Sequence, residues 1–116
     1  MLLTTMALLA VLQADLWLLV GSDGTYDSVE INRGTLEYDD EIVRLRERRV
    51  FSRNQGSYIR EDEVNCLERT LTVVAISWDH ARPGQPQQIT FERSERLSRP
   101  IDPDTFEEMI FDEVCR

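Results

Sequence analysis

Lysine is absent from this sequence, and histidine occurs only once, at His80. All 13 basic side chains are therefore arginine, which we attribute to codon bias in a GC-rich genome. Selection for guanidinium groups, which pair with carboxylates through two parallel hydrogen bonds, is the alternative explanation. The 22 acidic residues give the chain a net charge of −9 at pH 7. This charge excludes a general nucleic-acid binder, because phosphate binding needs a basic surface.

Motifs for catalysis and for cofactor binding are absent too. The sequence has no G-x-S-x-G element for a serine nucleophile, and a phosphate-binding loop would require a lysine. His80 follows Asp79 in a proline-flanked segment, which is typical of a surface histidine. We therefore expect no catalytic residue, no cofactor and no enzyme activity. Acidic residues also occur in runs that we expect to form solvated faces, at 39–41, 61–63 and 107–108.

Cysteine is scarce as well, since the chain contains only Cys66 and Cys115. Their spacing is not that of a CxxC redox motif, and with a single histidine in the chain they cannot complete a zinc site, so we expect no metal. In an oxidising compartment, two distant cysteines of a small domain most simply form one disulfide. It would close a loop of about 50 residues and contribute roughly 4 kcal/mol in the chain-entropy model.

The first residues have the character of an export signal. Residues 1–14 carry no charged side chain, and their apolar stretch ends at a small residue, Ala14. We predict a signal peptide of residues 1–14 and one domain of residues 15–116, with cleavage after Ala10 or a buried first strand or helix as alternatives. A transmembrane anchor would need about 20 apolar residues, and Asp15 interrupts the run too early. The mature chain is expected in the periplasm, at the cell surface or secreted.

Strand patterns dominate the middle of the chain. Apolar and β-branched residues alternate with polar ones between clusters of turn residues. The first two runs flank a glycine-rich turn and predict a hairpin, and the fourth is apolar on both faces, which predicts a position inside the sheet. The five predicted strands are residues 15–20, 25–31, 41–51, 69–78 and 89–93.

The end of the chain changes to a helical period. Asp102 followed by Pro103 predicts a helix start, with the aspartate as N-cap. Four apolar residues then share one helix face, namely Phe106, Met109, Ile110 and Val114. We therefore predict an α+β fold: an antiparallel sheet of about five strands with a C-terminal helix pinned by a disulfide.

Several short elements occur together in an order that points to one family. They are an early tryptophan (Trp17), a tyrosine strand (Tyr26), the alternating strand Val43 to Arg46, an N-C-x-x-R-T element (Asn65, Cys66, Arg69, Thr70), and an I-x-P-x-T element before a helix ending in V-C (Ile101, Pro103, Thr105, Val114, Cys115). With these elements the chain resembles the surface-adhesin protein E-like family of small bacterial envelope proteins over almost its whole mature length.

The resemblance implies an exported antiparallel sheet with a C-terminal helix, and it supports the pairing of Cys66 with Cys115. It does not transfer adhesion, because a shared scaffold does not fix a function. The chain departs from the family pattern at Asp79-His80 and in a basic run at residues 44–53.

That basic run is the candidate binding site. The functional interpretation is an arginine strip that faces an acidic protein or a polyanionic glycan, because arginine is enriched at interface hot spots. The alternative is pairing with acidic residues of neighbouring strands or of the terminal helix. The strip consists of Arg44, Arg46, Arg48, Arg49 and Arg53.

Together these features predict a non-catalytic, monomeric binding or structural module of a bacterial envelope. It would have no nucleic-acid partner and no transmembrane anchor after signal cleavage. The alternative function is a small envelope enzyme or an enzyme-inhibitor domain centred on the loop at residues 79–88.

Overall fold

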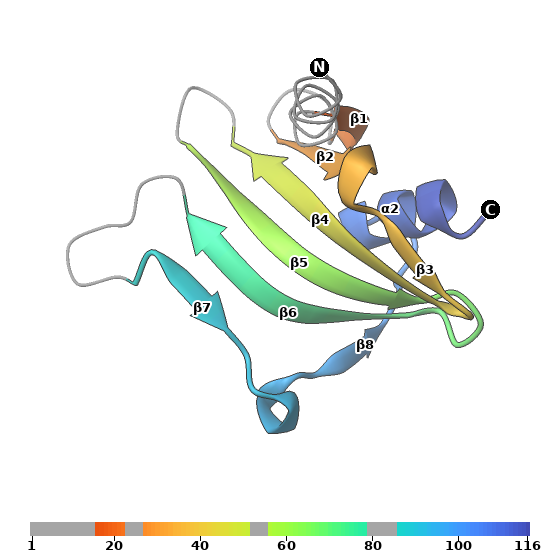
Figure 1. The fold of residues 1–116 in the computed structure, drawn as a ribbon. Helices are drawn as coiled ribbons and strands as arrows, with labels where there is room; N and C mark the ends of the chain where they lie inside the picture. The colour runs from red at the N-terminus through yellow and green to blue at the C-terminus, as the bar shows by residue number, and fades with distance from the viewer. Residues whose placement is uncertain (1–15, 23–26, 52–55, 79–85) are drawn as a thin grey trace, which may run out of the picture.

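The computed structural model describes residues 16–22, 27–51, 56–78 and 86–116. In these residues the chain forms an antiparallel sheet of eight strands, two short 3₁₀ helices and one C-terminal α-helix (Figure 1). The strands are β1 (Trp17–Ser22), β2 (Ser28–Asn32), β3 (Glu37–Asp39), β4 (Ile42–Val50), β5 (Ser57–Asn65), β6 (Thr70–Trp78), β7 (Gln88–Thr90) and β8 (Ser98–Pro100). The helices are η1 (Arg33–Thr35), η2 (Arg93–Glu95) and α2 (Phe106–Val114). The predicted antiparallel sheet with a C-terminal helix is confirmed, while the predicted number of about five strands was too low.

The main path of the sheet runs β1-β2-β4-β5-β6-β7. Strands β1 and β2 form the predicted hairpin, with Trp17 opposite Asn32. Strand β6 pairs with β5 along one edge. Along its other edge it pairs first with β8 and then, further along, with β7. The run that is apolar on both faces therefore lies inside the sheet, as its sequence predicts.

Strand β5 is the main element that the sequence patterns did not predict. It pairs with β4 along its whole length and lies between β4 and β6. Glu61 and Glu63 face outward opposite arginines of β4, whereas Asp62 points to the interior and is only 1% exposed. The prediction of a solvated acidic run at 61–63 was wrong for Asp62. The prediction failed because acidic residues occupy both faces of this strand. They hide the alternation of polar and apolar side chains that marks a half-buried strand.

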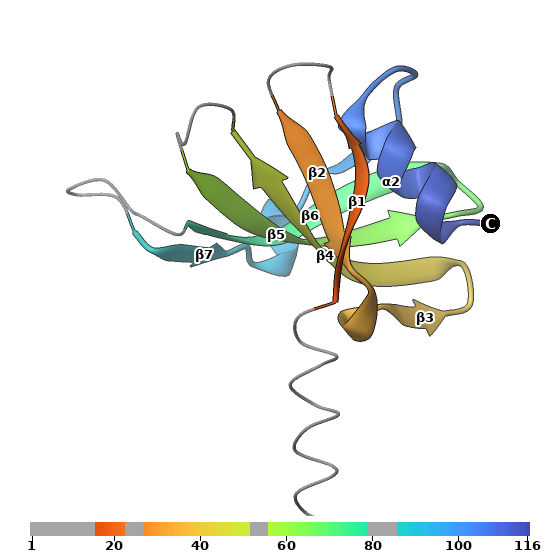
Figure 2. The same ribbon diagram turned by 90° about the horizontal axis from the view of Figure 1, so that it is seen from above.

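The sheet has two different faces. The helix-side face carries the apolar core, and α2 packs on it next to β1 (Figure 2). A Cβ atom at Gly21 of β1 would overlap with Sδ of Met109, so the missing side chain allows the helix to approach the strand closely. The core residues are Val29, Ile31, Val43, Leu45, Val64, Leu71, Ile101, Ile110, Phe111 and Val114. The opposite face, called the open face below, carries Arg44, Arg46 and Arg48 of β4 together with Glu61 and Glu63 of β5.

Helix α2 begins later than predicted. Asp102 is not its N-cap, because the chain first makes a turn in which Asp104 adopts a left-handed conformation with φ 62°. The N-cap is Thr105, whose hydroxyl accepts a hydrogen bond from the amide of Glu108 at 3.2 Å and donates one to the carbonyl of Asp102 at 2.7 Å. Ile110 and Val114 of the predicted apolar face are buried against the sheet.

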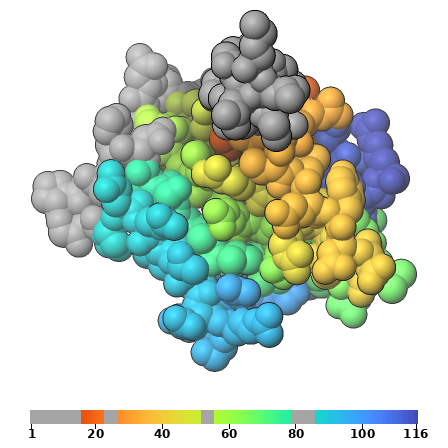
Figure 3. Space-filling view, in the orientation of Figure 1, coloured from red at the N-terminus to blue at the C-terminus, as the bar shows by residue number. Residues whose placement is uncertain are grey.

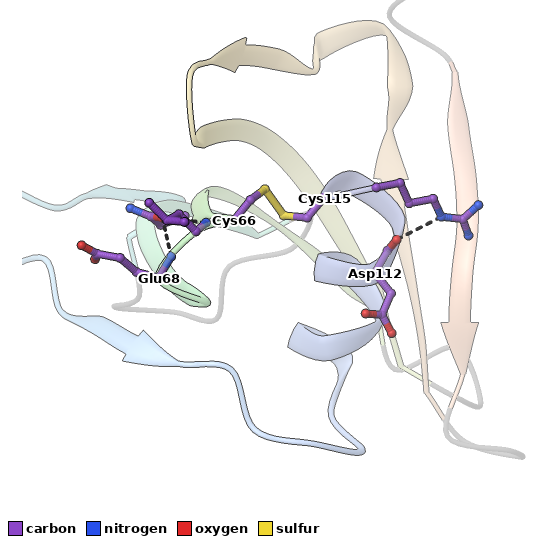
Figure 4. Close-up of a disulfide and its surroundings, with 7 residues drawn as sticks. Cys66, Glu68, Asp112 and Cys115 are labelled. Carbon is purple, nitrogen blue, oxygen red and sulfur yellow. Dashed lines mark hydrogen bonds between the residues drawn. A yellow bond between two sulfur atoms is a disulfide. The ribbon is translucent and has the colours of Figure 1, made fainter.

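The disulfide joins the turn after β5 to the end of α2 (Figure 4). The Cα atoms of Cys66 and Cys115 lie 5.5 Å apart, which confirms the predicted pairing. The turn is itself ordered by Asn65, whose Oδ1 accepts hydrogen bonds from the amides of Leu67 and Glu68 at 3.1 and 2.8 Å. The bridge therefore fixes the last turn of the helix to a well-defined corner of the sheet.

The predicted signal peptide, residues 1–14, lies outside the described residues. Among the residues that the structure does describe, no helix has the length and apolar character needed to cross a membrane.

Candidate functional site

The arginine strip divides between the two faces of the sheet. Arg44, Arg46 and Arg48 alternate on the open face, which Figure 3 shows from the front with α2 visible only at the edge. Arg49 points to the helix-side face, where its side chain is only 15% exposed. Arg53 lies outside the described residues. Arg49 therefore does not share a surface with Arg44, Arg46 and Arg48.

Carboxylates of the protein itself meet the three arginines of the open face. The shortest Nε–Oε1 distances are 3.4 Å for Arg44–Glu63, 4.0 Å for Arg46–Glu61 and 2.8 Å for Arg48–Glu30. The guanidinium of Arg48 also lies 4.4 Å from the centre of the Trp17 ring. The intramolecular pairing that the sequence left as an alternative is thus present on this face.

Arg49 belongs instead to a cluster of charged side chains under the helix, which we call the buried charge network. Its Nε donates to Oε1 of Glu47 at 2.6 Å, and its Nη2 donates to Oε1 of Glu107 at 2.5 Å. Arg60 of β5 lies 3.3 Å from Asp62 through Nε, and its Nη2 lies 3.5 Å from Glu47 and 3.8 Å from Glu107. The network thus connects β4, β5 and α2.

Sequence reasoning missed this network, although a signal for it exists. Glu47 and Arg49 are two residues apart on β4, as are Arg60 and Asp62 on β5, and residues two apart share a strand face. Because Val43 and Leu45 precede Glu47 on the same face, the pattern places a carboxylate in the core. Val43 and Leu45 identify the inward face of β4, but they do not reveal that the end of this face is charged.

The network contains one carboxylate more than its guanidinium groups can neutralise. Glu47 and Asp62 are 0% and 1% exposed, and their Oε2 and Oδ2 atoms accept no hydrogen bond within the part of the chain that the structure describes. Burial and the neighbouring charge of Glu47 raise the pKa of Asp62 well above its usual range, and Arg60 and Arg49 oppose this only in part. Burial and this neighbouring charge therefore both disfavour the ionised form of the Asp62 carboxyl.

The outer members of the network remain charged. Burial favours a higher pKa for Glu107, but its hydrogen bond with Arg49 and the charge of Arg49 outweigh this and hold the pKa below its usual range. Burial favours a lower pKa for Arg49, but the charge of Glu47 and the bond with Glu107 raise it above its usual value.

A pocket of about 620 Å³ adjoins the network on the helix-side face. Arg60 and Glu107 form its charged wall, and strand β6 supplies part of its apolar lining. Its opposite side is the chain from Phe91 to Thr105, which connects β7 to α2. The other lining residues are Leu71, Val73, Ile76, Phe91, Glu95, Leu97, Arg99, Pro100, Asp102 and Thr105.

Backbone bonds hold this connecting segment at the edge of β6. The amide of Phe91 donates to the carbonyl of Val74 at 2.8 Å, and the amide of Ile101 donates to the carbonyl of Arg69 at 3.1 Å. Between these two anchors, Glu92 and Glu95 cap the η2 turn reciprocally. The segment therefore curves away from the sheet and returns to it, which leaves the pocket between them.

Two other candidate sites have no support in the described residues. His80 and most of the 79–88 loop lie outside them, since the structure resumes its description at residue 86. No group of three histidine, cysteine or acidic side chains within 16–22, 27–51, 56–78 and 86–116 is arranged to hold a metal ion.

Comparison with models of protein families, with curated proteins and with solved structures finds no match for this chain. The resemblance to the surface-adhesin protein E-like family stays a prediction from the sequence.

Proposed function

We propose that the protein is a non-catalytic, exported binding module of a bacterial envelope and that its ligand site is the pocket beside the buried charge network. The observation that carries this proposal is the pocket itself. Its volume of about 620 Å³ lies within the range of about 300–1,000 Å³ that small-molecule sites occupy. Its lining combines apolar side chains, which can hold the body of a ligand, with five charged ones, which can orient it.

The position of the acidic residues supports binding rather than catalysis. Glu47 and Asp62 are fully buried and do not line the pocket. A general acid or base must reach its substrate within hydrogen-bond distance, which these two carboxyl groups cannot do. Glu107 does reach the pocket, but Arg49 and Arg60 already bind its carboxylate.

Export is supported by the disulfide. A bridge between Cys66 and Cys115 persists in oxidising compartments such as the periplasm and is rare in the cytosol. The arginines of the open face do not carry the proposal, because carboxylates of the same chain already engage them.

The proposal is tested with an uncharged fluorescent probe, N-phenyl-1-naphthylamine, which brightens in apolar sites. Val73→Trp places an indole in the pocket, whereas Val74→Trp adds the same bulk to the neighbouring residue, which lines a different depression of the surface. We expect the probe to bind the parent chain and the Val74→Trp variant, and to lose at least tenfold in affinity for Val73→Trp. Equal probe binding by the two variants would remove the pocket as the ligand site.

A further inference from the structure

The charges around the pocket are unequal in number. Its lining contains three carboxylates, Glu95, Asp102 and Glu107, and two guanidinium groups, Arg60 and Arg99. Directly behind the Arg60 wall lie two further acids, Glu47 and Asp62, and one further arginine, Arg49. Acidic groups therefore outnumber basic ones in the lining of the pocket, whereas behind it the raised pKa of Asp62 reduces the acidic excess.

The guanidinium group of the charged wall is not available to a ligand. Arg60 lies within 4.0 Å of carboxylate oxygens of Glu47, Asp62 and Glu107, and its side chain is only 12% exposed. An anionic ligand at this wall would have to compete with all three of these acids.

The side chains at the rim of the pocket, unlike Arg60, are available to a ligand. Asp102 and Arg99 make no side-chain hydrogen bond or ion pair within the described parts of the chain, so both are open to a ligand. Glu95 accepts one hydrogen bond through Oε1 from the amide of Glu92, and its carboxylate has further capacity. The rim thus offers two carboxylates against one guanidinium.

We infer that the pocket takes an amphipathic monocation, a molecule with an apolar body and one ammonium or guanidinium head. The apolar body fits against Val73, Ile76 and Phe91, and the head lies towards Asp102 and Glu95. This inference rests on the proposed function, because it names the class of ligand for the same pocket.

The buried charge network links this ligand to a proton. The buried carboxyl of Asp62 shares this network with Glu47 and Arg49 of β4, Arg60 of β5 and Glu107 of α2, and Tyr58 lies near Arg49. A positive charge in the pocket disfavours a proton on the nearby Asp62 carboxyl, because the two positive charges repel each other. Binding of the cation should therefore release a fraction of a proton, and binding of an uncharged analogue should not.

Three probes with the same alkyl tail separate the possibilities: octylammonium, octanol and octanoate. Displacement of N-phenyl-1-naphthylamine from the full chain measures their affinities. We expect octylammonium to bind at least about threefold more tightly than octanol, and octanoate to bind most weakly, as a Coulomb energy across about 6 Å of water-like medium predicts.

Variants of the rim test the same charges from the protein side. Asp102→Asn should weaken octylammonium binding by about threefold, and Arg99→Gln should strengthen it by a similar factor. Asp39→Asn removes the same charge from β3, outside the pocket, and should leave the affinity unchanged. Calorimetry in two buffers of different ionisation enthalpy should detect proton release with octylammonium and none in Asp62→Asn.

Failure of the inference is distinguishable from failure of the proposed function. If octanoate binds most tightly and Val73→Trp still abolishes binding, the pocket is a ligand site but the cation is the wrong class. If none of the three probes responds to Val73→Trp, the pocket is not the ligand site and both proposals are overturned.

Discussion

The surroundings of Asp62 shift the balance between the charged and neutral forms of its carboxyl group. It lies among Glu47, Arg49, Arg60 and Glu107 and is almost completely buried. An isolated carboxylate would be very unfavourable in such a place, and protonation is the cheapest way to bury it. The neighbouring Glu47 lies in contact with two guanidinium groups, those of Arg49 and Arg60.

The raised pKa of Asp62 predicts how stability depends on pH. The folded state holds a proton that an unfolded aspartate releases above about pH 4. This contribution to stability is fully present below that pH and is lost as the pH rises through the folded pKa. The lowered pKa of Glu107 acts in the opposite direction, and its contribution is lost as the pH falls.

Asp62→Asn keeps the neutral state at every pH, because an amide cannot ionise and can donate to Glu47. We expect its free energy of unfolding, measured in urea at pH 5 and pH 8, to fall less towards pH 8 than that of the parent chain. Glu63→Gln changes the neighbouring carboxylate on the open face and should leave the parent slope unchanged. An Asp62→Asn variant with the full parent slope would show that Asp62 is not the titrating group.

Two arginines on adjacent strands test the difference between buried and exposed ion pairs. Arg60→Ala leaves buried carboxylates without their cation and should cost about 3–5 kcal/mol of unfolding free energy. Arg46→Ala removes an arginine whose side chain is 42% exposed and whose carboxylate partner is 4.0 Å away, and should cost about 0–1 kcal/mol. Urea denaturation of both variants gives the comparison, and similar losses would contradict the assignment of Arg60 to a buried network.

The strands and the helix differ in how far their sequences reveal them. Strands β4 and β6 are predictable, because apolar and β-branched residues mark their inward faces. Strand β5 is not, because Arg60 and Asp62 occupy its inward face and are accommodated only by partners from β4 and α2. Those partners are distant in sequence, so no local pattern reports them.

The candidate site follows the same division. The alternation of Arg44, Arg46 and Arg48 on one face is readable from the sequence, whereas their pairing with acids depends on the register between β4 and β5. The pocket depends on a segment that leaves the edge of β6 after Phe91 and rejoins it, through backbone hydrogen bonds, at β8 and Ile101. Hydrogen bonds of this kind have no signature in residue type.

The disulfide attaches the C-terminal helix to the sheet. Cys115 follows α2 directly, and Cys66 lies in the corner between β5 and β6. We expect Cys66→Ser/Cys115→Ser to lower the free energy of unfolding by about 2–5 kcal/mol, measured by urea denaturation. The reduced parent chain is the matched comparison and should behave alike; an unchanged stability in both would show that packing alone holds the helix.

At the scale of the whole molecule, the sheet is larger than its single helix can cover. Helix α2 packs next to β1, while the part of the same face formed by β5 and β6 borders the pocket. On the open face, acidic and basic side chains neutralise one another in pairs. We therefore expect ligand binding on the helix-side face and solvent contact on the open face.

Methyl chemical shifts of the full chain, recorded during a titration with octylammonium, test this assignment most directly. We expect the methyl groups of Val73, Ile76 and Leu97 to shift together as the pocket fills. The methyl groups of Leu19 and Ile59 should keep their chemical shifts, because both residues lie on the open face. There Leu19 is opposite Glu30, and Ile59 is opposite Arg48. Shifts confined to Leu19 and Ile59, with Val73 and Ile76 unchanged, would place binding on the open face and contradict the account.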